Sequence, residues 1–247
     1  MQNTVEMINI NDFPDEILTQ ILFFLPYKQA FRTTILSKRW RLLPCSLAIL
    51  DIDDYSVMDI NDWFRFRQFM NKLIFSPHSR HLPLTSFYLN CHSTRGFWDW
   101  ATYDLWIKAA KHCHVKLLSL FFLSTLAMGM APYTIFCCKT LVVLRLRNAN
   151  MTCCSVDLPL LKELYLSKVR FSDMDDLNRL VYGCPILEIL TTSFVETSNG
   201  VAVGGGYLKP LSNLIKAEIH LFDVPFRTFC NVQSLTIFEV ESNSEFG

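Results

Sequence analysis

Adjacent histidines and cysteines come closest to a metal-binding pattern in this sequence. The groups are His112-Cys113-His114, Cys91-His92, Cys137-Cys138 and Cys153-Cys154. Structural zinc sites space their ligands so that the side chains converge on one ion, whereas neighbours on a strand point to opposite faces. We therefore expect no zinc site. The count of nine cysteines is odd, and we interpret them as reduced thiols, most of them buried.

A glycine cluster at residues 204–206 raises a second kind of chemistry, phosphate binding. A phosphate loop needs a preceding strand, a lysine at the helix start and a serine or threonine after it. Here Lys209 is followed by Pro210, so we expect a surface loop. No G-x-S-x-G motif, paired-carboxylate setting or Cys/His catalytic grouping stands out. We expect a protein that is not an enzyme and that holds no cofactor or metal.

Basic residues cluster at Lys38, Arg39 and Arg41, which raises the possibility of a DNA-recognition helix. The patch is small, and the whole chain has 23 basic and 23 acidic residues. A neutral chain lacks the electrostatic attraction that drives nucleic-acid binding. We therefore expect no nucleic-acid partner, and we interpret the patch as a solvated helix face or one that pairs with acidic residues of a partner.

The chain is rich in hydrophobic residues for a soluble protein, at 51% of 247 residues. That content suits a repeat core, a surface buried by a partner, or both. The stretch 117–138 has no charged residue and is long enough to span a bilayer, but Gly129, Pro132 and the repeat described below argue against a membrane span. Because the start of the chain does not resemble a signal peptide, we expect the cytoplasm, the nucleus or both.

The first 50 residues predict three short helices. Asn11 or Asp12 is placed to cap the first, with Pro14 in its first turn, and Pro26 ends it. A second helix is expected over 27–35 and a third over 37–43. A unit this small has more apolar surface than it can bury against itself. Either the following residues or a second protein covers the excess, and the spacing alone does not decide between them.

This unit resembles an F-box, particularly the plant type with an LSKRW motif. The resemblance rests on FPDEIL at residues 13–18, on the leucine pattern that follows it, and on LSKRWR at residues 36–41. Phe13, where the family usually has leucine, and Pro44 depart from the pattern. The resemblance implies docking onto a Skp-type adaptor and, through it, a cullin. By position, it assigns docking or its support to Pro14, Ile17, Leu18, Ile21, Leu22, Leu25, Leu36 and Trp40.

The rest of the chain predicts one amphipathic helix and then leucine-rich repeats. The helix is expected over 62–75, with Asp62 as its cap. The pattern L-x-x-L-x-L then recurs with a mean separation of about 25 residues, which is in the range of leucine-rich repeats. Return helices are expected over 99–112 and 175–182. The middle residues of the repeats are Phe87, Leu118, Leu144, Leu164, Leu190, Ala217 and Leu235.

The predicted fold is α/β: a small three-helix F-box at 10–50, a linking helix region at 51–83, about seven irregular leucine-rich repeats at 84–240 in a curved solenoid, and a frayed tail at 241–247. The turn beginning at Cys184 resembles the plant F-box/leucine-rich-repeat proteins. The resemblance implies a substrate-recognition subunit of an SCF-type ubiquitin ligase. By strand register, the residues expected to face a client are Arg145, Arg147, Glu163, Tyr165, Lys216, Glu218 and His220.

Two alternatives remain open. The repeats could form a protein-binding scaffold that recruits no ligase, with the first helices merely capping them. A membrane-associated form is the third interpretation, and we expect it less than the other two.

Overall fold

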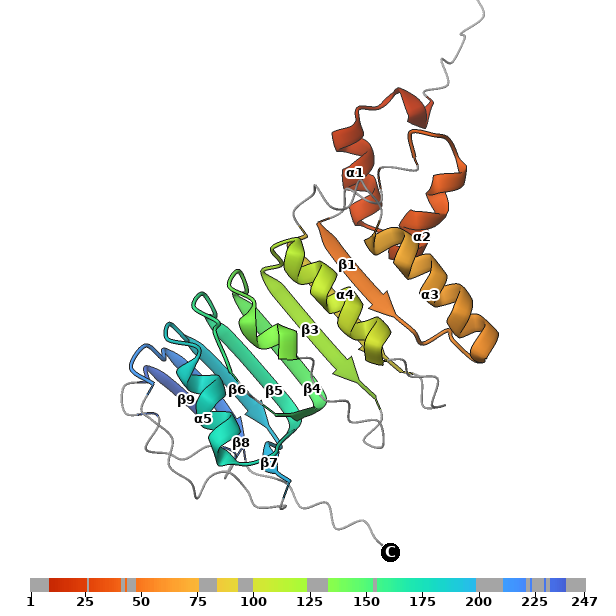
Figure 1. Cartoon of the computed structure of the whole chain (residues 1–247). Coiled ribbons are helices and arrows are strands. Elements are labelled where there is room, and N and C mark those ends of the chain that lie inside the picture. The colour runs from red at the N-terminus through yellow and green to blue at the C-terminus, as the bar shows by residue number, and fades with distance from the viewer. Residues whose placement is uncertain are drawn as a thin grey trace, which may run out of the picture.

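The computed structural model describes residues 9–25, 27–40, 43, 48–75, 84–92, 100–123, 133–152, 155–198, 211–220, 223, 229 and 232–238. Two parts follow one another in the chain: a group of short helices, then a large sheet with further helices on one side (Figure 1). Several predictions fall outside the described residues, among them the glycine cluster at 204–206, the tail at 241–247 and the positions of Pro26, Pro44, Cys153 and Cys154.

The sheet has nine strands in the order β1-β2-β3-β4-β5-β6-β8-β9, with β7 paired to β5, and every pairing is parallel. Neighbours in the chain are thus neighbours in the sheet, as stacked repeats require. The strands are β1 (Ile49–Asp53), β2 (Ser86–Cys91), β3 (Leu117–Phe122), β4 (Val143–Met151), β5 (Glu163–Phe171), β6 (Ile189–Ser193), β7 (Glu196–Thr197), β8 (Lys216–His220) and β9 (Ser234–Phe238).

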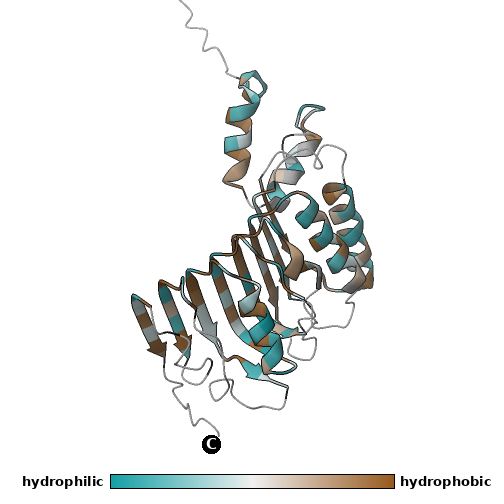
Figure 2. Cartoon of the chain, turned by 60° about the vertical axis from the view of Figure 1, so that its left-hand side comes forward, coloured by the Kyte–Doolittle hydropathy of each residue, from teal (hydrophilic) through white to brown (hydrophobic). Residues whose placement is uncertain are grey.

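Helices cover one face of this sheet (Figure 1). They are α3 (Ile60–Ile74), α4 (Trp100–His112), α5 (Met174–Tyr182) and the short 3-10 helix η6 (Tyr133–Cys137). Burial alternates along the strands: Leu144 and Leu146 of β4 are buried beside Leu164 and Leu166 of β5, and the residues between them face outward. Hydrophobic and hydrophilic residues accordingly alternate along the strands in Figure 2. One hydrophobic core joins the sheet to α3, α4 and α5.

The parallel sheet begins earlier in the chain than the sequence pattern predicted. Strand β1 pairs with β2 in the repeat register, with Leu50 opposite Phe87 and Ile52 opposite Leu89. The first repeat was expected at Leu84, and β1 lies across the predicted boundary between the F-box and the linking region. The signal was present, because Leu47-x-x-Leu50-x-Ile52 fits the repeat pattern. The long helix α3 between β1 and β2 hid it by stretching the repeat spacing.

The predicted helices are present, but two predicted caps are wrong. The N-cap of α3 is Asp59, whose side chain accepts a hydrogen bond from the backbone N–H of Asp62, so the helix starts two residues before Asp62. Helix α1 (Asp15–Phe23) has Pro14 at its N-cap and no side-chain cap, so neither Asn11 nor Asp12 caps it. Both lie in a separate 3-10 helix, η1 (Ile10–Asp12). Helix α2 (Tyr27–Arg32) continues into the 3-10 turn η2 (Thr33–Ile35).

Three consecutive strands bend at the same repeat position. Asn148, Lys168 and Phe194 each lie four residues after the middle leucine of their repeat, and each has a positive φ, between 52° and 59°. The pairing of β4 with β5 skips Asn148 opposite Lys168 and resumes at Ala149 opposite Val169. The side-chain alternation of β4 therefore changes phase, which buries Ala149 and Met151. The aligned kinks are β-bulge-like features repeated from strand to strand.

The end strand and the uncharged stretch also differ from prediction. Leu235 and Ile237 of β9 were expected to point into the core, but both are more than one third exposed, because β9 is the last strand of the sheet. The described part of the uncharged stretch 117–138 forms strand β3 and helix η6 rather than one long helix. Within the described residues, no helix combines the length and apolar character needed to cross a membrane.

Candidate interaction surfaces

Helix α1 carries two apolar stripes that face in different directions. Leu18 and Leu22 are fully buried, and Leu25 is packed against them. Ile17 and Ile21, one residue earlier in each turn, are each 40% exposed. Because residues four apart share a helix face, one stripe holds the helices together and the other faces outward.

The buried stripe belongs to a small core of its own. Its five buried hydrophobic residues are Leu18, Leu22, Ala30, Trp40 and Leu43. Trp40 is the largest side chain in it, and the indole Nε1 donates a hydrogen bond to Asn11 Oδ1 at 2.7 Å. The LSKRW motif thus supplies the central side chain of the helical unit.

Arg39 of the same motif ties down the chain before α1. Its guanidinium donates to Asp15 Oδ1 and to the backbone oxygens of Asn11 and Phe13, each at 2.6 Å. A charge-assisted network of this kind is stronger than neutral hydrogen bonds. The basic patch therefore has an internal role at Arg39, which pairs with Asp15 of this chain, although the sequence suggested a DNA contact or an acidic partner as its use.

The outward stripe is part of a larger exposed apolar surface, which we call the α1 stripe surface. Phe24 is 83% exposed and Ile35 is 86% exposed, which are extreme values for large apolar side chains. Other large apolar residues of the helical unit that are exposed include Phe13, Ile17, Ile21, Phe23 and Leu36. Contiguous exposed apolar residues on a folded protein mark interaction sites.

The eight predicted docking residues fall into two groups. Pro14, Ile17, Ile21 and Leu36 are exposed and can touch a partner. Leu18, Leu22 and Trp40 are buried, and Leu25 is half-buried, so these four support the helices from within. Sequence spacing could not separate the groups, because all eight are apolar or aromatic at helical spacing. Phe24 and Ile35 were not among the predicted docking residues, although they are the most exposed.

The predicted client residues lie on the face of the sheet opposite the helices. Arg145 and Arg147 of β4 are exposed, and Glu163 and Tyr165 of β5 are partly exposed beside them. Lys216, Glu218 and His220 occupy the equivalent outward positions on β8. The strand register places Arg145 opposite Tyr165. Whether a client touches these residues stays a prediction.

Both arginines of this face are stacked on aromatic rings. The guanidinium carbon of Arg145 lies 4.7 Å from the ring centroid of Tyr165, and that of Arg147 lies 4.9 Å from the centroid of Phe121. Cation–π stacking fixes the side chains while their hydrogen-bonding edges stay available. Within the described residues, neither arginine forms an ion pair with a carboxylate of the chain.

The remaining predicted client residues interact among themselves. Tyr165 donates its hydroxyl to Glu163 Oε2 at 2.9 Å, and burial together with Glu163 raises the pKa of Tyr165. Lys216 forms an ion pair with Glu218 at 2.6 Å. His220 lies between the rings of Phe194 and Phe238, with centroids at 4.7 Å and 5.8 Å. These contacts brace the face and leave the β4 arginines as its unpaired cations within the described residues.

The first two strands add acidic residues that the sequence pattern missed. Asp51 and Asp53 of β1 point outward, beside Tyr88 and Asn90 of β2. Burial, with a further contribution from Asp53, raises the pKa of Asp51, although Asn90 donates to it at 3.1 Å and opposes that rise. The prediction missed them because it placed the first strand at residue 84.

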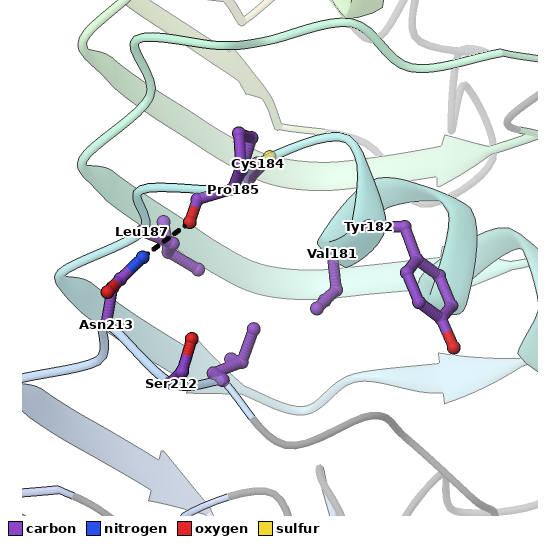
Figure 3. A pocket seen from close by; sticks show the side chains of 8 residues that line it. Val181, Tyr182, Cys184, Pro185, Leu187, Ser212 and Asn213 are labelled. Carbon is purple, nitrogen blue, oxygen red and sulfur yellow. Dashed lines mark hydrogen bonds between the residues drawn. The ribbon is translucent and has the colours of Figure 1, made fainter.

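Neither a metal site nor a large pocket occurs in the described part of the chain. No cluster of three or more potential metal ligands is present there. Cys91, Cys138 and Cys184 are buried free thiols, as expected, and Cys113 and Cys137 are half-buried. A crevice between α5 and the turn at Leu211–Asn213 has a volume of about 180 Å³ and is lined by residues such as Tyr182 and Leu187 (Figure 3). Cofactor-sized pockets begin near 300 Å³.

Comparison with known protein families places both parts of the chain. The F-box domain matches residues 10–51. The family described as "FBD-associated F-box protein At5g56370, LRR repeats" matches residues 103–203. A helical unit followed by parallel repeat strands therefore defines the class, an F-box protein with leucine-rich repeats.

Relatives in Arabidopsis thaliana have the same order of parts in their names. The putative F-box/FBD/LRR-repeat protein At4g00315 is 35% identical over 191 residues, which cover 74% of this chain and 42% of the relative. The putative FBD-associated F-box protein At5g56690 is 32% identical over 198 residues, covering 75% and 47%. The F-box/LRR-repeat protein At1g55660 is 30% identical over 190 residues, covering 74% and 51%.

The chain belongs to the plant F-box proteins with leucine-rich repeats. It spans about half the length of these relatives.

Proposed function

We propose that this protein is the substrate-recognition subunit of an SCF-type ubiquitin ligase. The F-box docks onto a Skp-type adaptor and thereby onto a cullin, and the repeat strands hold a client. The subunit itself performs no chemistry and raises the concentration of the client near a ubiquitin-loaded enzyme. Its site of action is the cytoplasm, the nucleus or both. The F-box domain at residues 10–51 supports this proposal, because F-box domains generally bind Skp adaptors.

One observation carries the adaptor half of the proposal: the α1 stripe surface leaves large apolar side chains in water while a parallel stripe is buried. Fully burying an apolar side chain of this size contributes about 1.5–3 kcal/mol. The exposed portions of Phe24 and Ile35 alone would thus contribute a few kcal/mol on docking. A helix face laid into a hydrophobic groove is a common recognition mode.

The client half rests on the outward face of the sheet. We propose that the repeats form a curved leucine-rich-repeat array and that a client lies against the exposed strand residues. Support comes from the parallel register, which lines up side chains of successive repeats in rows, and from the stacked arginines, which are rigid and exposed. Rigid polar and aromatic side chains on an open face suit specific protein recognition.

Co-purification with a Skp-type adaptor tests the proposal. We expect the wild-type chain, co-expressed with the adaptor, to elute with it as one complex. Ile17→Asp with Ile21→Asp should abolish the complex while leaving the fold intact, because both side chains lie on the outward stripe. Gln20→Asp is the matched control: it adds the same charge on the same helix, at an exposed residue outside the stripe.

The alternative, a scaffold that recruits no ligase, predicts a different result. The wild-type chain would then be soluble alone, would not co-elute with the adaptor, and would behave like the double variant. Circular dichroism of all three proteins separates loss of docking from loss of folding.

A further inference from the structure

The outward face of the sheet has a division of charge that repeats in two rows. The strand register connects Asp51 of β1 through Tyr88 and Ser119 to Arg145 of β4. Two residues further along each strand, it connects Asp53 through Asn90 and Phe121 to Arg147. Both rows therefore run from an acidic residue on β1 to an arginine on β4. We call these ends the acidic pole and the basic pole.

Neither pole is neutralised by opposite charge within the described residues. The acidic pole receives neutral donors: Asn90 to Asp51 at 3.1 Å and the backbone N–H of Tyr55 to Asp53 at 2.7 Å. His92 Nε2 lies 3.7 Å from Asp53, and this contact is ionic only when the imidazole is protonated. The raised pKa of Asp51 agrees with a carboxylate that lacks a cationic partner.

The basic pole is held in place by rings. Tyr165 and Phe121 stack on the guanidiniums, and Glu163, the acidic neighbour of this pole, is engaged by the Tyr165 hydroxyl at 2.9 Å. The forked edges of two arginines, two residues apart on one strand face, are suited to carboxylates. The next outward charges beyond β5 cancel, because Lys216 and Glu218 pair with each other.

The spacing of the poles limits what fits between them. Three strand-to-strand steps separate β1 from β4, which is about 14 Å at about 4.8 Å per step. An extended chain covers that distance in about four residues, at about 3.3 Å per residue. The surface between the poles is neutral and partly aromatic, with Tyr88, Ser119 and Phe121.

We infer that the client presents an extended protein segment that crosses β1 to β4, with a basic residue at the acidic pole and an acidic residue about four positions away at the basic pole. This inference rests on the proposed function, whose client it describes. A nucleic acid is disfavoured, because a phosphate backbone that follows the same path would meet Asp51 and Asp53. The complementary charges set orientation and specificity more than affinity.

A peptide-display selection tests the inference directly. The full chain is immobilised, and a library of random 12-residue peptides is selected on it and, in parallel, on a variant in which the poles are exchanged (D51R, D53R, R145D, R147D). We expect enriched peptides with opposite charges about four residues apart. On the exchanged variant the two signs should trade places. A synthetic peptide of the enriched sequence should bind about tenfold more weakly to R145S with R147S than to the wild-type chain.

Several outcomes would overturn the inference. They are a selection with no enrichment over the R145S with R147S variant, enriched peptides without a charge order, and an order that stays the same on the exchanged variant. Tighter binding of a 20-nucleotide single-stranded RNA than of the enriched peptides would overturn it as well. Circular dichroism of each variant confirms that it is folded.

The test is independent of adaptor binding. Peptide selection needs no adaptor, and the pole residues lie outside the F-box helices. If the adaptor fails to bind while the charge order is recovered, the proposed ligase role fails and the inference about the face stands. If the adaptor binds and the order is absent, the reverse holds.

Discussion

The helical unit and the sheet dispose of their apolar residues in opposite ways. In the sheet, the alternation of Leu144, Leu146, Leu164 and Leu166 with outward polar residues sends nearly all large apolar side chains into a core shared with three helices. In the helical unit, five residues form the whole buried cluster, and side chains as large as Phe24 remain in water. The sheet is thus complete in itself on its helical side, whereas the helical unit has an apolar surface that a partner can cover.

This difference indicates two kinds of recognition. An apolar helix stripe provides affinity with little discrimination, which suits a partner shared by many proteins. A braced face with charged rows discriminates by sign and spacing, which suits a particular client. The predictions below test the comparison, beginning with the largest expected effect.

A charge in either core should have consequences of different reach. Leu164→Asp places a carboxylate at a fully buried position in the middle of the sheet and should cost about 4–5 kcal/mol, enough to unfold the array. Leu18→Asp should cost the helical unit as much while the sheet survives, because Leu18 belongs to the separate cluster. Limited proteolysis followed by mass spectrometry reads this out. Cleavage confined to the first 50 residues in both variants would contradict the division.

Trp40→Ala should destabilise the helical unit by about 3–5 kcal/mol. It removes the largest side chain of the small core and the hydrogen bond to Asn11. Lys38→Ala, an exposed neighbour, is the control and should change stability by no more than about 0.5 kcal/mol. Urea unfolding of both variants measures the effect. Equal stabilities would show that Trp40 is not central to the unit.

Gly183→Ala should destabilise the sheet by about 1–3 kcal/mol through overpacking. A Cβ at Gly183 would lie 2.3 Å from Val156 Cγ1 and 2.7 Å from the backbone oxygen of the same residue. The backbone at Gly183 has an ordinary φ of −74°, so crowding alone is responsible. Tyr182→Phe, at the exposed preceding residue, serves as the control. Thermal unfolding that leaves Gly183→Ala at the wild-type midpoint would rule out the close contact.

Lys168→Gly should stabilise the sheet by about 0.5–1 kcal/mol. Lys168 holds a φ of 52°, which costs a residue with a Cβ but not glycine. Ser167→Gly, one residue earlier and without a positive φ, should instead destabilise. Denaturant titration of the two variants gives the comparison, and the same sign for both would argue against the aligned kinks.

Asp51→Asn should slightly stabilise the folded chain at pH 7. Burial, then Asp53, raises the pKa of Asp51, so the folded chain holds that proton more tightly than the unfolded chain does. Ionisation of Asp51 therefore costs stability as the pH rises through the raised value. Asparagine removes the cost, and its advantage should vanish at a pH below the ordinary carboxyl range. A wild-type chain as stable as the variant at pH 7 would contradict the assignment.

The sequence predicted element types well where a repeated pattern was present. The leucines of β3 to β6 and the helices α3, α4 and α5 follow from periodicity alone. Strand β1 escaped because α3 stretches its repeat beyond the usual length. The caps were misplaced because several acidic or amide residues stand near each helix start, and only the folded backbone selects Asp59 over Asp62.

The candidate surfaces were predictable only in part. Strand register gave the outward position of Arg145 and Arg147, since side chains alternate along a strand. It could not reveal their stacking on Tyr165 and Phe121, which depends on contacts between neighbouring repeats. The split between Ile17 and Leu18 also required the fold, because both are aliphatic residues on adjacent positions of one helix.

The central claim is that the outward stripe of α1 is the docking face. Cysteine footprinting in the complex with a Skp-type adaptor tests it most directly. Ile17→Cys, Ile21→Cys and Gln20→Cys chains are alkylated with and without the adaptor, and mass spectrometry of the α1 peptide gives the rate at each position. We expect about tenfold protection at positions 17 and 21 and unchanged labelling at position 20. Equal labelling at positions 17 and 21 with and without bound adaptor would contradict the claim.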